Sequence, residues 1–115
     1  GNKTMDDLEL KELAQFYGTE QYHKVMGLNA TDGVAYIMQN GYSWLVTDAA
    51  AVIMTKLKGQ EFLSIKLKVK DSKAKMIITD GNDKTLYTQD YKYTDAKRDL
   101  NLYCTDGVIM LSGEY

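Results

Sequence analysis

The side chains that can do acid–base chemistry are few and lie apart along the chain. His23 is the only histidine among the 115 residues, and the carboxylate of Glu20 lies three positions before it. An imidazole near a carboxylate can serve as a general base or as a pH-sensitive switch. No nucleophile is placed to match this pair, which favours a surface or hydrogen-bonding role for His23 over a catalytic one.

Asp48 is a third catalytic candidate because of where it lies. It is the only formally charged residue between Asp32 and Lys56, in the most apolar stretch of the chain. A buried carboxylate needs a charged or hydrogen-bonding partner. A salt bridge or a polar strip along a helix explains Asp48 more simply than catalysis with His23 does.

Cys104 is the only cysteine, so the chain can form neither an internal disulfide nor a zinc site built from cysteines. It follows two leucines at alternating positions, a pattern typical of a small buried hydrophobe. A reactive thiol would need an activating base, and none is visible in the sequence. The chain also lacks the acid spacing of a calcium loop, a phosphate loop and a nucleophile elbow. We therefore expect no metal and no cofactor, and we favour a non-enzymatic role over an enzymatic one.

A basic strand face is the one localised electrostatic feature. Lys66, Lys68 and Lys70 alternate with apolar residues, so they share one face of a strand. With tyrosines interleaved, and Tyr22 as a further candidate, such a face can stack the bases of a single-stranded nucleic acid. The net charge of -2 and the lack of an RNP-type aromatic motif favour a solvated face instead.

These residues need elements to position them, and the apolar period changes from helical to extended after Gly59. Three helices are predicted before it. The first spans residues 5–16. The second spans residues 31–41, with Thr31 or Asp32 as its cap and Asn40 with Gly41 at its end. The third runs from its cap, Ser43, to about residue 58. Trp44 is expected to anchor these helices to the sheet.

Five strands are predicted after Gly59, together with one short strand near residues 20–25. The five cover residues 61–70, 74–79, 85–93, 100–104 and 108–112, separated by turn residues. The order of helices followed by strands indicates a single α+β domain over residues 1–115. In it, about three N-terminal helices pack on one face of a C-terminal antiparallel meander of four to five strands.

The apolar run at 31–54 is broken by Asn40 and Gly41, so it predicts two helices rather than a membrane span. The chain as given starts without the apolar region of a secretory signal. We therefore expect a cytoplasmic protein that does not contact a membrane.

An ordered set of short motifs covers almost the whole chain. It comprises QFYGTEQY at 15–22, TDGV at 31–34, WL at 44–45, LKV at 67–69, DGN at 80–82, YTD at 93–95, LY at 102–103, and GV at 107–108 followed by EY at 114–115. In this order the motifs resemble a small bacterial, phage- and plasmid-borne domain family of unknown function. The resemblance implies a fold class and a mobile-element setting, and it implies no reaction.

Three functional hypotheses follow. The first is a small non-enzymatic binding or adaptor protein that contacts a protein partner or forms a homodimer. The alternative is a nucleic-acid-binding domain that uses the basic face, and the second alternative is an enzyme that uses His23 with Glu20 or Asp48.

Overall fold

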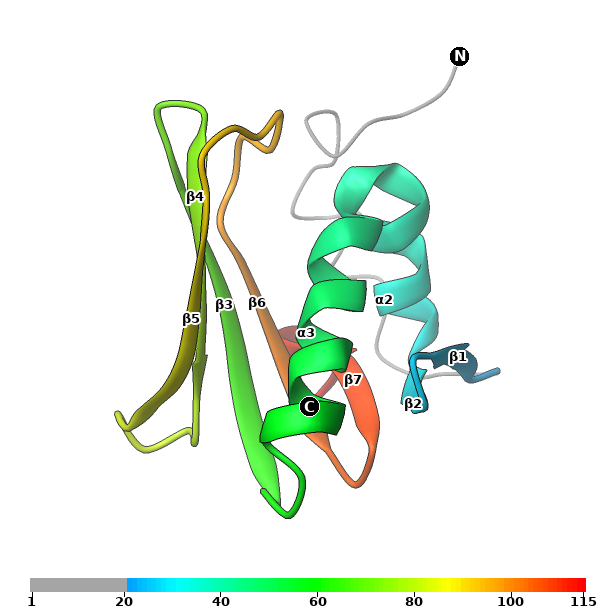
Figure 1. Cartoon of the computed structure of the whole chain (residues 1–115). Coiled ribbons are helices and arrows are strands. Elements are labelled where there is room, and N and C mark those ends of the chain that lie inside the picture. Colours follow the sequence, from blue (N-terminus) through cyan, green and yellow to red (C-terminus); the bar gives the residue numbers. More distant parts are fainter. Residues whose placement is uncertain (1–20) are drawn as a thin grey trace.

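The computed structural model describes residues 21–115 (Figure 1). The helical elements are α2 (Asp32–Ile37), the π-helical turn η2 (Met38–Tyr42), α3 (Ser43–Lys56) and the 3-10 helix η3 (Ser112–Glu114). The strands are β1 (His23–Val25), β2 (Leu28–Ala30), β3 (Phe62–Lys70), β4 (Lys73–Thr79), β5 (Thr85–Tyr91), β6 (Leu100–Thr105) and β7 (Val108–Leu111). The helix predicted at 5–16 lies outside the described residues.

Residues 21–115 form one seven-stranded sheet in the order β1-β2-β7-β6-β3-β4-β5. Neighbouring strands are antiparallel except β2 and β7, which are parallel. The predicted architecture, three helices on a meander of four to five strands, is therefore wrong. The sheet is larger and mixed, and in the described part of the chain α3, with 14 residues, is the one long helix.

The sheet departs from a meander because β6 pairs with β3 and not with β5. The helix-facing side chains of β6 are fully apolar and buried, which suits the centre of the sheet, whereas those of β5 are half-buried and partly polar. Residues 92–99 carry the chain from the β5 edge past the end of β4 and β3 (Figure 1). Two hydrogen bonds hold this crossing, from Thr94 N to Ser72 O (2.8 Å) and from Val69 N to Asp99 Oδ1 (2.8 Å).

The helical region follows the predicted caps in part. The Thr31 hydroxyl caps α2 by accepting a hydrogen bond from Val34 N at 3.2 Å. Asn40 and Gly41 leave helical geometry, Gly41 with a φ of 105° that suits a residue without a side chain. Ser43 does not act as a cap, because the chain passes from η2 directly into α3. The short strand β1 lies within the segment predicted as extended at 20–25.

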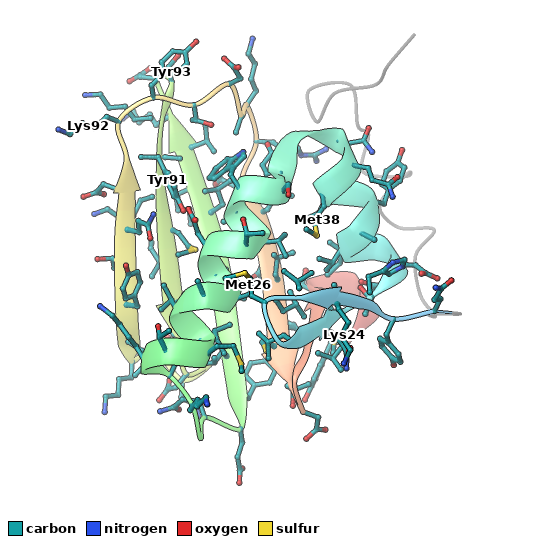
Figure 2. The ribbon with its side chains drawn as sticks, turned by 45° about the vertical axis from the view of Figure 1, so that its right-hand side comes forward. Lys24, Met26, Met38, Tyr91, Lys92 and Tyr93 are labelled. Carbon is teal, nitrogen blue, oxygen red and sulfur yellow. The ribbon has the colours of Figure 1, made fainter. Side chains whose placement is uncertain are left out.

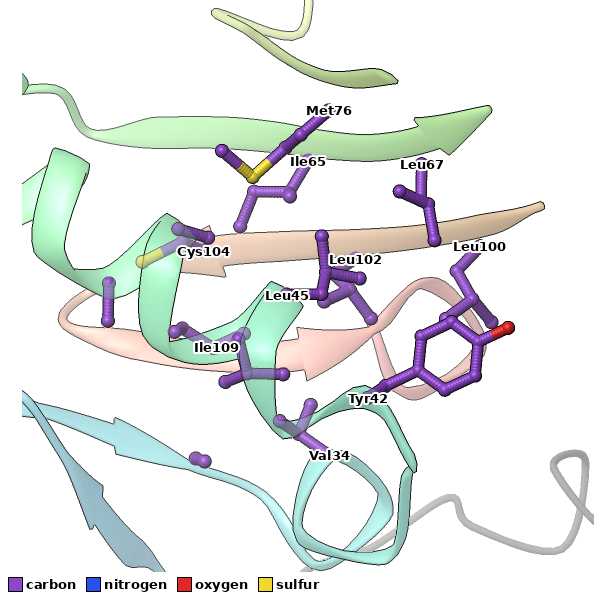
Figure 3. Close-up of a cluster of buried hydrophobic side chains, with 14 of the residues drawn as sticks. Val34, Tyr42, Leu45, Ile65, Leu67, Met76, Leu100, Leu102, Cys104 and Ile109 are labelled. Carbon is purple, nitrogen blue, oxygen red and sulfur yellow. The ribbon is translucent and has the colours of Figure 1, made fainter. Parts of the chain in front are cut away.

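The core lies between α3 and one face of the sheet (Figure 3). Leu45 of α3 and strand residues such as Ile65, Leu102 and Ile109 have no exposed surface. Trp44 packs edge-on against Tyr91 with ring centroids 4.7 Å apart, which joins α3 to β5. This arrangement leaves the opposite face of the sheet free of α3. Among the described residues, no helix has the length and apolar character needed to cross a membrane.

Candidate functional site

The strand register decides which side chains share the sheet face opposite α3, which we call the open face. Every second residue of β3 points there, because its alternate neighbours are buried beneath α3. Lys66 lies opposite Ile77 of β4 and Asn101 of β6. By this register the open face carries Phe62, Ser64, Lys66, Lys68 and Lys70 from β3, Lys73, Lys75, Ile77 and Thr79 from β4, and Asn101, Tyr103 and Thr105 from β6.

A hollow of about 540 Å³ lies on the open face. Three aromatic rings line one end of it. Phe62 lies 5.0 Å from Tyr103 and 5.4 Å from Tyr115, and the two tyrosine rings are 5.4 Å apart, all measured between centroids. Gly81 closes against Phe62, since a Cβ at Gly81 would lie 2.8 Å from the Phe62 ring. Lys66 and Lys68 line the hollow beyond the rings.

The floor of the hollow is polar although it is largely shielded from water. Ser64 and Thr79 are buried, and the Ser64 hydroxyl contacts Asn101 Oδ1 at 3.3 Å. The Thr79 hydroxyl accepts a hydrogen bond from Gly81 N at 3.1 Å. Asn101, whose Oδ1 accepts from the Ser64 hydroxyl, also lines the hollow, and its amide nitrogen is a group that can donate to a ligand. Rings, amide and ammonium groups therefore converge on one concavity.

The open face is positively charged, although the whole chain carries a net charge of -2. Lys68 pairs with Asp99 at 3.8 Å and Lys75 with Asp90 at 3.7 Å, both in exposed positions where such pairs are weak. Within residues 21–115, the remaining lysines of this face have no ion-pair partner; they are Lys66, Lys70 and Lys73. Asp83 lies on the lining of the hollow, and Gly81 of the same loop contacts the aromatic end.

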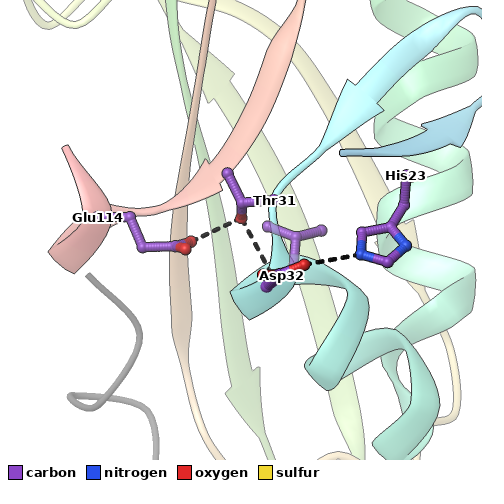
Figure 4. A network of polar contacts seen from close by, with 5 residues as sticks. His23, Thr31, Asp32 and Glu114 are labelled. Carbon is purple, nitrogen blue, oxygen red and sulfur yellow. Dashed lines mark hydrogen bonds and ion pairs between the residues drawn. The ribbon is translucent and has the colours of Figure 1, made fainter. Parts of the chain in front are cut away.

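His23 does not meet the other predicted catalytic residues. Its Nε2 lies 2.9 Å from Asp32 Oδ1, while Glu20 lies outside the described residues (Figure 4). Next to this pair, the Thr31 hydroxyl donates to Glu114 Oε1 at 2.7 Å. Glu114 Oε1 also accepts a hydrogen bond from Leu111 N at 2.8 Å. The contacts tie β1, α2 and η3 together, which gives His23 a hydrogen-bonding role.

Asp48 is held on the other side of the molecule by β5. Its Oδ2 accepts hydrogen bonds from the Tyr91 hydroxyl at 2.8 Å and from Gln89 Nε2 at 3.3 Å. Burial, followed by the hydrogen bond to Asp48, raises the pKa of Tyr91 well above its ordinary value. Figure 2 shows Tyr91 on the α3 side of the sheet, with Lys92 and Tyr93 beyond the end of the strand. Asp48 thus finds its polar partners on the sheet and attaches α3 to β5.

The other sequence candidates divide between the open face and elsewhere. Lys66 and Lys68 line the hollow, and Lys70 lies farther along the same strand face. Tyr22 is 56% exposed and precedes β1, at the opposite edge of the sheet from β5. Cys104 is buried, and burial raises the pKa of its thiol to about 11, so the thiol is protonated at neutral pH.

Sequence patterns alone miss the aromatic end of the hollow and Asn101. Phe62 and Ser64 share the alternation of the three lysines, so this part of the face could have been found from the strand pattern. Tyr103 and Asn101 reach the hollow only because β6 pairs with β3. Tyr115 follows η3 and reaches the hollow through its contacts with Phe62 and Tyr103.

Comparison with known proteins places the chain in a family without assigning a reaction. No curated protein and no solved structure matches the chain. Among the described residues, no group of three or more histidine, cysteine or acidic side chains is arranged to hold a metal ion. Residues 7–115 match the model of the family of unknown function DUF6876, and the chain belongs to that family.

Proposed function

We propose that this is a non-enzymatic binding protein and that the open face of its sheet takes the ligand. The observation that carries the proposal is the hollow of about 540 Å³, in which aromatic rings, an amide and lysines converge. Its size falls within the range of about 300–1,000 Å³ that is usual for ligand pockets. Its aromatic rings and its few buried polar groups supply the two kinds of contact, apolar and hydrogen-bonding, by which ligand sites hold their ligands.

The positions of the acids and bases support binding over catalysis. His23 is engaged with Asp32, and Asp48 is engaged with Tyr91 on another part of the molecule. Neither residue lines the hollow. A catalytic site would instead bring a base within hydrogen-bond reach of a nucleophile and of a place for substrate.

A screen of small aromatic acids by two-dimensional amide NMR tests this proposal while the natural ligand is still unidentified. We expect the largest shift changes at Ser64, Gly81 and Asn101. The Asn101→Trp variant should fill the hollow and abolish these changes. Lys24→Trp adds the same ring to an exposed position of β1 and serves as the control. Binding only at other surfaces, or shifts that persist in Asn101→Trp while thermal melting shows it folded, would refute the proposal.

A further inference from the structure

We propose that the ligand of the open face is a single-stranded nucleic acid, with a base at the aromatic end of the hollow and its phosphates along the lysines of β3. This inference rests on the proposed function of the open face and names the class of ligand. It is carried by three independent features: an aromatic cluster with one exposed ring, a linear row of cations, and the place of Asp83, the one acid among the described residues that line the hollow.

The aromatic end offers ring surface that the fold does not use up. Phe62, Tyr103 and Tyr115 meet edge-on or tilted, with interplanar angles of 49°, 75° and 81°, so they form a cluster of rings at one end of the hollow. Tyr115 is 74% exposed, although a ring of this size gains by being covered. Nucleobases stack on such rings whatever their sequence, because every base has a π-face.

The cations lie in a row that leads away from these rings. Along β3, Lys66, Lys68 and Lys70 recur every second residue, which spaces them by about 6.6 Å. Lys70 lies eight residues from Phe62, about 26 Å along the strand at the usual rise. A single nucleotide cannot reach from the rings to the end of this row, whereas an extended chain of phosphates can. Lys73 and Lys75 of the adjacent strand widen the same row.

The positions of the acids on the open face agree with a base at the aromatic end and phosphates along the lysines. Asp99 and Asp90 each pair with a lysine, which leaves Asp83 as the acid on the lining of the hollow. The loop of Asp83 contacts the aromatic end through Gly81 and Phe62. Asp83 therefore faces the expected place of a base, whose amino groups can donate to a carboxylate, and lies away from most of the expected phosphates. A purely acidic peptide would leave the rings without a role.

Fluorescence anisotropy with labelled oligonucleotides tests the inference on the full chain. Oligo-dT and oligo-U of about 12 nucleotides cover the usual site sizes of about 4–16. If about three phosphates are neutralised, the logarithm of affinity should fall with the logarithm of salt at a slope of about -2. Affinity should then drop roughly 20-fold between about 50 and 200 mM salt, and the two oligomers decide between DNA and RNA.

Matched variants separate the rings from the lysines. Lys66→Ala with Lys70→Ala should weaken binding and make the salt slope shallower by about 1.4, at about 0.7 per phosphate contact. The control variant, Lys24→Ala with Lys58→Ala, removes the same charge from other exposed positions. It should change neither the affinity nor the salt slope. Tyr115→Ala should reduce affinity about tenfold without changing the slope. Tyr93→Ala, at a residue with the same exposed fraction of 74%, should leave affinity unchanged.

Four outcomes would overturn the inference. Equal affinity for thymidine monophosphate and the oligomers would show a nucleotide site, and equal affinity for a polyglutamate peptide would show a general anion surface. Absence of oligonucleotide binding at low salt, while aromatic acids still bind the hollow, would reject nucleic acid and leave the proposed function standing. Failure of both ligands would reject both proposals.

Discussion

The hydroxyl of Tyr91 connects the apolar helix α3 to β5, one of the two edge strands of the described sheet. Asp48 gives α3 its one carboxylate, and that group is half-shielded between the helix and β5, where it accepts hydrogen bonds from Tyr91 and Gln89. The ring of Tyr91 also packs on Trp44. A partly buried carboxylate is stabilised by its hydrogen-bond donors. The stability of the protein should therefore depend on the hydroxyl oxygen of Tyr91.

Replacing Tyr91 by Phe removes that atom and keeps the ring. We expect the free energy of unfolding to fall by about 1–3 kcal/mol, because Asp48 loses its shorter hydrogen bond while it stays partly buried. Urea unfolding followed by Trp44 fluorescence measures the loss. Tyr22→Phe, at an exposed ring, is the control and should change stability little. Equal stability of Tyr91→Phe and the parent would show that the hydrogen bond contributes nothing net.

Cys104 gives the stability of the protein a dependence on alkaline pH. Burial raises the pKa of its thiol from 9.0 to about 11, so between these values the unfolded chain releases this proton while the folded chain keeps it. The contribution of the thiol to stability is therefore fully present below pH 9 and is lost as pH rises through 11. The free energy of unfolding falls by up to about 1.4 kcal/mol per pH unit because of this group. Unfolding by urea across this range should show a shallower decline for Cys104→Ala. The same decline in both proteins would assign the effect to other groups, of which Tyr91 is one.

At the scale of elements, the end of the described chain is held against α2 by a close fit. The carboxylate of Glu114 accepts from the Thr31 hydroxyl and from Leu111 N, which joins η3 to the start of α2 (Figure 4). Gly33 makes room for this contact, because a Cβ there would lie 2.7 Å from Glu114 Oε1 and from Leu111 Cδ1. A glycine in the first turn of a helix costs helix propensity, and here the close approach explains it.

Gly33→Ala should therefore destabilise the protein by about 1–3 kcal/mol. This is the opposite of the stabilisation that alanine usually brings when it replaces glycine within a helix. Glu114→Ala should cost a similar amount through its two lost hydrogen bonds. The double variant should lose less than the sum of the single variants, because removing the carboxylate relieves much of the clash. Thermal or urea unfolding of the four proteins completes the cycle. Strict additivity would mean that Gly33 and Glu114 do not meet.

The same elements show what sequence patterns can and cannot predict. The alternation of apolar and polar residues predicts the ends of most strands to within a few residues. The capping role of Thr31 is also predictable, because a cap depends only on residues close to it in the sequence. The order of the strands depends on contacts between β6 and β3, more than thirty residues apart. Local patterns carry no such information, so they favour a meander and do not place Tyr103 and Asn101 beside Lys66. Ser43 fails as a cap because η2 continues the backbone into α3.

At the scale of the whole molecule, the two faces of the sheet differ in what covers them. One face is covered by α3 and holds the core, and the other carries five lysines, 66, 68, 70, 73 and 75, on a chain whose net charge is -2. Folding is what creates this asymmetry. In the unfolded chain the same lysines lie among acids such as Asp71 and Asp83 and have no aromatic cluster beside them. A ligand of the open face should therefore bind the folded state almost exclusively.

Exclusive binding to the folded state predicts a rise in melting temperature that depends on ligand concentration. At an oligonucleotide concentration about a hundredfold above Kd, stability should increase by about 2.7 kcal/mol, which corresponds to about 10 °C for a domain of this size. The Lys66→Glu, Lys70→Glu variant should melt close to the parent without ligand, since both positions are exposed, and should lose the ligand-dependent rise. The Lys24→Glu, Lys58→Glu variant carries the same net charge and should keep the rise. If both variants lose it equally, total charge and not the open face governs binding, because only the position of the substituted lysines distinguishes them.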